Sequence, residues 1–76
     1  MRRFEYLVVF TKDDRVLTAN GHWQGTEDRG SPGGLDSCPS LFEYLEEAGA
    51  QGWELVSVDP EGHGTAQLYF KRTHGR

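Results

Sequence analysis

The first apolar run of the chain, from Phe4 to Thr11, has the composition of a β-strand. It is rich in aromatic and β-branched residues, which pack well on a pleated surface. Because side chains alternate between the two faces of a strand, both faces of this one are apolar in the middle. One face carries Phe4, Tyr6, Val8 and Phe10, and the other carries Leu7 and Val9. Such a strand is usually central in its sheet, or has its second face covered by a partner.

A short second strand is expected after the turn-forming residues 12–15. Val16–Thr18 can return beside the first strand, and Asn20-Gly21 marks another turn. The segment from Gly21 to Asp36 then holds five glycines and few large apolar side chains, too few to offset the entropy lost on ordering. We therefore expect a flexible glycine-rich loop at about residues 21–36, most mobile from Glu27 to Gly34.

The strongest helix signal begins at Ser40. The sequence from Ser40 to Glu43 matches a capping box, in which the serine hydroxyl accepts a hydrogen bond from the amide of Glu43. Ser37, one turn earlier, is an alternative N-cap. Gly49 and Gly52 are expected to end the helix, with Gly52 at positive φ.

Apolar residues at helical spacing predict which side of this helix is buried. The i, i+4, i+7 stripe consists of Leu41, Leu45 and Ala48. We expect Phe42 to widen the buried stripe. The acidic residues Glu43, Glu46 and Glu47 are expected to face water.

The last part of the chain predicts a β-hairpin. Trp53–Asp59 and Thr65–Lys71 have strand composition, and Pro60–Gly64 is the turn that joins them. Trp53 is expected to cap the apolar end of the core. The order β-β-α-β-β predicts an α+β fold with a single antiparallel-rich sheet of three to four strands and one helix packed on one face.

Three blocks of sequence resemble one family when taken together. They are Tyr6-Leu7-Val8-Val9, the run GAQGWELVSV from Gly49 to Val58, and Tyr69-Phe70-Lys71-Arg72. In this order they resemble a family of short bacterial domains of unknown function. The resemblance implies the architecture given above and carries over no catalytic, cofactor-binding or partner-binding residue. The long glycine-rich segment departs from the family pattern, and a partner-specific feature is therefore expected there.

Length and composition limit what the chain can be. Its 76 residues allow one small domain, 1–76, whose core leaves a net stability of roughly 3–5 kcal/mol without a disulfide, a metal or a partner subunit. A single cysteine, Cys38, excludes an internal disulfide framework and favours a reducing compartment. The apolar stretch Tyr6–Phe10 is too short for a signal peptide or a membrane span. We therefore expect a cytoplasmic protein.

The net charge of −4 argues against a general nucleic-acid-binding surface, because such surfaces neutralise phosphates with basic side chains. A local basic patch forms only if the two ends of the chain are neighbours in the sheet. Its candidate residues are Arg2, Arg3, Lys71 and Arg72. Solvated strand ends that keep the domain soluble are the more ordinary interpretation of these charges.

No combination of residues predicts catalysis or a bound cofactor. The cysteine and histidines, Cys38, His22, His63 and His74, do not occur at metal-ligand spacings. No motif supplies the strained turn or the oxyanion donors that accompany a catalytic nucleophile. Cys38 is expected to be a small, half-buried residue near the start of the helix. We therefore expect a non-enzymatic protein without a metal or cofactor.

Uncovered apolar area points instead to protein contacts. One helix covers only one face of a four-stranded sheet, and an uncovered apolar face usually becomes an interface. Trp23, with His22 beside it, lies outside any apolar periodicity and is a candidate partner contact. We expect an interaction or regulatory module that forms a homodimer through its sheet and contacts an unknown protein partner. The alternatives are a weak nucleic-acid or acidic-partner binder that uses the terminal basic residues, and a small-molecule-binding domain.

Overall fold

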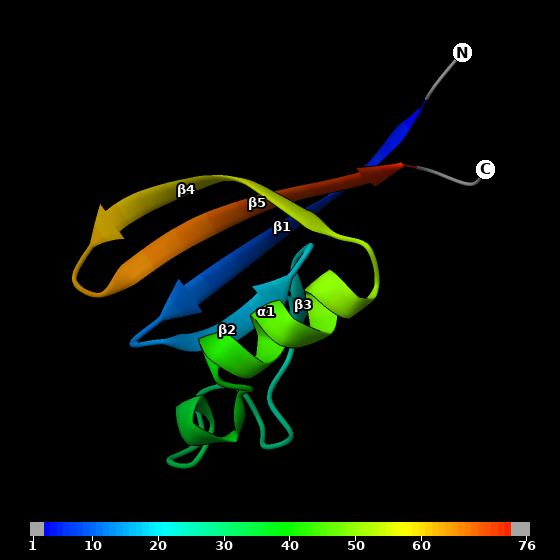
Figure 1. Ribbon diagram of the computed structural model, residues 1–76. Helices are drawn as coiled ribbons and strands as arrows, with labels where there is room; N and C mark the ends of the chain where they lie inside the picture. Colours follow the sequence, from blue (N-terminus) through cyan, green and yellow to red (C-terminus); the bar gives the residue numbers. More distant parts are fainter. Residues whose placement is uncertain (1–2, 74–76) are drawn as a thin grey trace.

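A five-stranded antiparallel sheet with one α-helix on one face makes up the fold (Figure 1). The computed structural model describes residues 3–73. The strands are β1 (Phe4–Lys12), β2 (Arg15–Ala19), β3 (His22–Trp23), β4 (Glu54–Gly62) and β5 (Thr65–Thr73), and the helices are the 3-10 helix η1 (Leu35–Ser37) and α1 (Leu41–Ala50). The sheet order is β3-β2-β1-β5-β4, with β1 at the centre. The α+β class and the central first strand are confirmed, whereas the expected three to four strands are corrected to five.

The strand that the sequence did not predict is β3, which lies inside the segment expected to be a loop. Asn20 and Gly21 both have positive φ, 50° and 84°, the combination of a type I′ turn that folds a strand back on its neighbour. His22 and Trp23 consequently pair with Ala19 and Thr18. Two residues are too few to show the alternation of a strand, so the sequence pattern did not reveal them.

The two longer hairpins also have two-residue turns with positive φ. Asp13 and Asp14 join β1 to β2, and His63 and Gly64 join β4 to β5. The predicted five-residue turn over Pro60–Gly64 is therefore wrong, because β4 continues to Gly62. The β4–β5 register is irregular between Pro60 and Gly62, where an extra residue keeps the strand paired past the proline.

The predicted start of the helix and its end before Gly52 are confirmed, whereas Gly49, also expected to end the helix, lies inside α1. The Ser40 hydroxyl accepts a hydrogen bond of 3.2 Å from the amide of Glu43, and Gly52 has a φ of +89° just beyond the last helical residue, Ala50. Ser37, the alternative N-cap, instead ends η1.

One prediction about the buried side of α1 is wrong. Leu41, Leu45 and Ala48 pack on the core as expected. Phe42, however, is 71% exposed, and Tyr44 occupies the core side in its place. The residue one turn beyond Phe42 on the same side is Glu46, so Phe42 lies at the polar border of the stripe.

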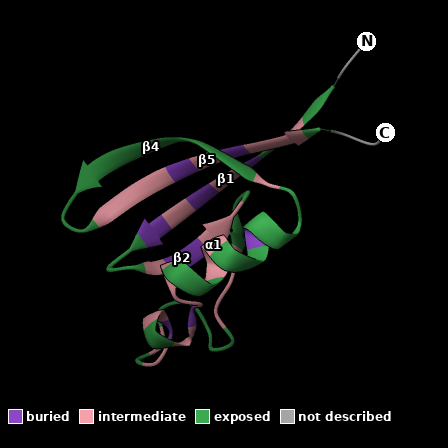
Figure 2. Ribbon diagram, viewed as in Figure 1, coloured by how far each residue is buried: buried purple, intermediate pink, exposed green. Residues whose placement is uncertain are grey.

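The core lies between α1 and the strands β1, β2 and β5, away from β4 (Figure 2). Its buried side chains are Leu7, Val9, Val16, Ala48, Leu68 and Phe70. Trp53 packs against this cluster at the C-terminal end of α1, as predicted. β4 is exposed along its whole length, so the single helix does not reach the edge of the sheet on that side.

The glycine-rich segment is built from turns that bond to one another. The indole Nε1 of Trp23 donates to the carbonyl of Glu27 at 2.9 Å, and the amide of Ser31 donates to the carbonyl of Asp28 at 3.1 Å. The amide of Glu27 in turn donates to the hydroxyl of Ser37 at 3.0 Å. The high mobility expected for residues 27–34 stays a prediction.

Gly52 gives a direct test of the helix end. We expect Gly52→Val to lower the free energy of unfolding by about 1–3 kcal/mol, because a β-branched residue is strained at positive φ. No neighbouring atom lies within 4 Å of a Cβ at this position, so the loss would come from the backbone.

Gly49→Ala is the matched control, since Gly49 is helical and also has open space for a Cβ. Alanine there should stabilise the domain by about 0.5–1 kcal/mol. Chemical denaturation measures both variants, and an unchanged midpoint for Gly52→Val would contradict the assignment.

Candidate functional site

The face of the sheet opposite the helix carries a row of apolar side chains. Residues paired across an antiparallel ladder share a face, and Val8 pairs with Tyr69. The even-numbered positions of β1 therefore lie on the same face as Tyr69, away from the core residues Leu7 and Val9. We call this set the open sheet face; on β1 and β5 it consists of Phe4, Tyr6, Val8, Phe10 and Tyr69. Trp23 borders it, because Phe10 pairs with Thr18 and Thr18 pairs with Trp23.

No helix covers the open sheet face within the described residues (Figure 1). None of its five side chains belongs to the core cluster or packs against it. Tyr6 is 66% exposed and Phe4 is 39% exposed, while the other three are half-buried. The face therefore presents aromatic and aliphatic groups to solvent in an arrangement that a second apolar surface could cover.

The open sheet face also carries charges of both signs. Lys71 pairs with Tyr6 across the ladder, and its ammonium group lies 4.8 Å from the ring centroid of Phe4. By the same register Lys12 lies on this face, and so does Asp59, which pairs with Gln67. Contact between two such faces can thus bring opposite charges together.

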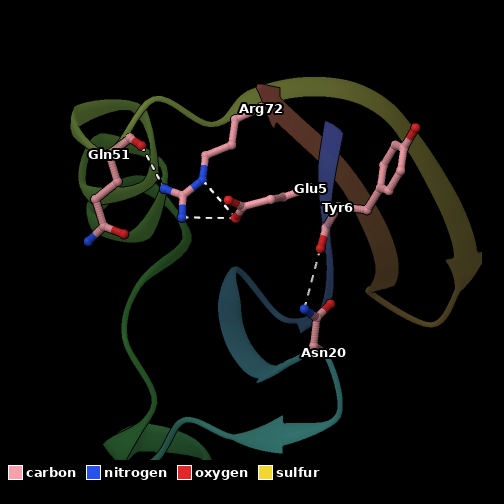
Figure 3. Close-up of polar contacts among 5 residues, drawn as sticks. All are labelled: Glu5, Tyr6, Asn20, Gln51 and Arg72. Carbon is pink, nitrogen blue, oxygen red and sulfur yellow. Dashed lines mark hydrogen bonds and ion pairs between the residues drawn. The ribbon is translucent and has the colours of Figure 1, made fainter. Parts of the chain in front are cut away.

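Asn20 holds the backbone of β1 beneath this face. β2 ends at Ala19, and the Asn20 side chain continues its hydrogen bonding. Its Oδ1 accepts from the amide of Val8 at 2.8 Å. Its Nδ2 donates to the carbonyl of Tyr6 at 3.4 Å (Figure 3). The strand that displays Tyr6 is therefore fixed on both sides, by β5 and by the end of β2.

Arg72 lies on the helix side and joins three parts of the chain. Its Nε donates to Oε1 of Glu5 at 3.1 Å, and its Nη2 forms an ion pair with the same oxygen at 3.0 Å (Figure 3). Its Nη1 donates to the carbonyl of Gln51 at 2.7 Å. Its guanidinium also stacks over the ring of Trp53, 4.1 Å from the centroid. These contacts tie the end of α1 to β1 and β5.

Two of the four basic residues predicted as a terminal patch, Lys71 and Arg72, do not share a face of the sheet. Lys71 and Arg72 are consecutive in a strand and point to opposite faces, and Arg72 is held by its contacts within the domain. Arg3 is exposed. Arg2 lies outside the described residues.

The predicted partner contacts His22 and Trp23 lie on the edge strand β3. His22 is exposed, whereas Trp23 is half-buried and bonded to the glycine-rich segment. The guanidinium of Arg29 lies 5.3 Å from the Trp23 ring centroid. Trp23 thus anchors its own loop.

Cys38 is buried more completely than expected, at 1% exposure. Burial raises the pKa of its thiol, while the nearby Arg15 and Arg29 lower that pKa by less. Arg15 also donates from Nη1 to the carbonyl of Cys38 at 2.8 Å. A buried thiol with a raised pKa is a packing residue and a poor nucleophile.

Within residues 3–73, no three His, Cys, Asp or Glu side chains are placed to hold a metal ion. His74, one of the residues considered as a ligand, lies outside this range. No helix among the described residues has the length and apolar character to cross a membrane.

A groove at the start of α1 was not predicted from the sequence. Its volume is about 330 Å³, and it is lined by Asp14, Ser40, Leu41, Phe42 and Leu45. Asp14 comes from the β1–β2 turn, so the groove depends on a tertiary contact. The sequence signal for such a groove is that Phe42 lies one helical turn from the charged Glu46, which places this aromatic ring at the border of the apolar stripe.

Comparison with known proteins gives no relative for this chain. No family model, no curated protein and no solved structure matches it. The resemblance to the family of short bacterial domains therefore stays a prediction.

The Arg72 contacts predict a measurable loss of stability. We expect Arg72→Ala to lower the free energy of unfolding by about 1–2 kcal/mol, because it removes packing on Trp53 together with hydrogen bonds to Gln51 and Glu5. Arg72→Lys should restore little of this, since lysine lacks the planar fork.

Lys71→Ala is the control, because the Lys71 ammonium group contacts the ring of Phe4 on the neighbouring strand, away from the helix end. Its expected loss is about 0.5–1 kcal/mol. Equal losses for Lys71→Ala and Arg72→Ala in urea denaturation would show that Arg72 does not tie the helix end to the sheet.

Proposed function

We propose that this protein is a small non-enzymatic interaction module that self-associates as a homodimer through the open sheet face. The observation that carries the proposal is the set of five apolar side chains on a face that no helix of the described chain covers. Water contact with these groups is unfavourable, and a second layer would remove it.

A second copy of the chain suits this face for two reasons. Lys12, Lys71 and Asp59 give the face both signs of charge, so two copies related by a two-fold axis can pair unlike charges. The face is also large enough. Three nine-residue strands cross it, and at about 3.3 Å per residue they extend roughly 30 Å, which suits the packing of two sheets about 10 Å apart.

Packing through the face is favoured over pairing through the sheet edges. The outer strand β4 contains Pro60 and two register irregularities, between Leu55 and Ser57 and between Pro60 and Gly62. Proline and bulges on an edge strand oppose the addition of another strand. The other edge, β3, has only two residues.

Sedimentation equilibrium at micromolar concentration tests the proposal. We expect the wild type to dimerise and Tyr6→Lys to weaken the dimer by about tenfold or more, because it places an additional cation among apolar groups. Tyr6 is mostly exposed in the single chain, so its replacement should leave the fold intact. Ala50→Lys adds the same charge at an exposed helix position and should leave the dimer unchanged.

A third variant, Val58→Lys, separates the two sides of the sheet. Val58 is exposed and pairs with the core residue Leu68, so it lies on the helix side, beyond the end of the cover that α1 provides. If Val58→Lys abolished the dimer and Tyr6→Lys retained it, the interface would lie on the helix side of the sheet. That result would overturn the proposal. An 8.6 kDa species at every concentration would do the same.

A further inference from the structure

The groove at the start of α1 is lined by apolar side chains and one carboxylate. Leu41, Phe42 and Leu45 supply its apolar lining, and Asp14 supplies a carboxylate. Its volume of about 330 Å³ is at the small end of the range for ligand pockets, roughly 300–1,000 Å³. It can therefore take one or two anchoring side chains of a larger partner more readily than a whole cofactor.

The only charged side chain that lines the groove is acidic. Arg15, next to Asp14 and bridged to Ser40 by its backbone, uses its guanidinium to donate to the carbonyls of Asp36 and Cys38. Glu43 and Glu46 are exposed and flank Phe42 on α1, and Asp13 precedes Asp14 in the turn. Of the described residues that line the groove, none is basic. Asp14, Glu43 and Glu46 form no ion pair with any residue in the range 3–73. A bound cation would thus meet carboxylates that form no ion pair within residues 3–73.

Two amides at the start of the helix are already hydrogen-bonded within the chain. The amide of Leu41 donates to the carbonyl of Asp14 at 2.8 Å, and the amide of Glu43 donates to the Ser40 hydroxyl. These donors are occupied within the domain, so an anionic ligand gains little from them. The groove is electrostatically suited to a positive partner.

We propose that this groove binds a basic amphipathic segment of a partner protein. Its apolar side chains would pack on Phe42, Leu41 and Leu45, and its Lys or Arg side chains would approach Asp14 and Glu46. An amphipathic helix laid in an apolar groove is an established form of recognition, and matched charges at the border set its specificity.

A second copy of the chain is a poor occupant of the groove. A two-fold contact there would bring Asp14, Glu43 and Glu46 of one copy against the same residues of the other, and like charges at an interface are costly. This groove lies on the helix side, whereas the open sheet face lies on the opposite side of the sheet. The two surfaces can therefore be occupied together, and the proposal does not rest on the dimer.

A peptide titration tests the groove. The probe is a fluorescently labelled synthetic peptide of leucine and lysine with the leucines at helical spacing, and the matched probe has glutamate in place of lysine. Fluorescence anisotropy should show binding of the lysine peptide, weakening as salt is added, and much weaker binding of the glutamate peptide.

Two variants locate the site. Phe42→Ala should weaken binding of the lysine peptide about tenfold, because it removes the most exposed anchor of the groove. Asp14→Asn should weaken it by a smaller factor, and asparagine tolerates the positive φ of this turn position. Glu54→Gln removes one negative charge beyond the far end of the helix and is the matched control, expected to bind as the wild type does.

The outcomes distinguish the groove from the open sheet face and from diffuse charge attraction. Equal binding of the two peptides, absence of binding, or an equal effect of Asp14→Asn and Glu54→Gln would overturn the proposal. If Phe42→Ala abolished self-association in sedimentation equilibrium, the groove would be occupied by a second copy of the chain. That result would also overturn the proposal. Loss of the dimer in Tyr6→Lys with peptide binding retained would leave the groove proposal supported.

Discussion

A single ten-residue helix cannot cover both faces of a five-stranded sheet, and this constraint shapes the rest of the molecule. The helix buries the central and β2 side of one face, and the core gathers there. The open sheet face and the border of the helix lie beyond its cover. β4 does too, and it is exposed along its whole length (Figure 2). For so small a domain, apolar area of this kind is also the readiest source of additional stability, through association.

Polar contacts hold α1 at both of its ends, and its middle packs on the sheet through apolar side chains. At its start, the Asp14 carbonyl accepts from the amide of Leu41, which joins the helix to the β1–β2 turn. At its end, Arg72 bonds to the carbonyl of Gln51 and stacks on Trp53. These two contacts set the position of α1 on the sheet. They therefore also determine which apolar residues of the sheet the helix leaves uncovered.

Local chemistry made much of this fold predictable from the sequence. The capping residue Ser40 and the positive φ of Gly52 depend on neighbours within a few positions, and both appear where the sequence placed them. The apolar alternation of β1 likewise predicted a face without cover. The features that were missed depend on contacts between distant residues. The groove combines Asp14 with the start of α1, and the Arg72 contacts depend on the register of β5 with β1.

Association through the open sheet face should bury that face and leave the helix side free. Hydroxyl-radical footprinting of the aromatic residues, compared between dilute and concentrated protein, measures this burial residue by residue. Tyr6 and Phe4 should become protected as the concentration rises, while Phe42, which is 71% exposed in the single chain, should remain reactive. Tyr6 that stays equally reactive at both concentrations, or protection that falls on Phe42 instead, would contradict a dimer formed through the open sheet face.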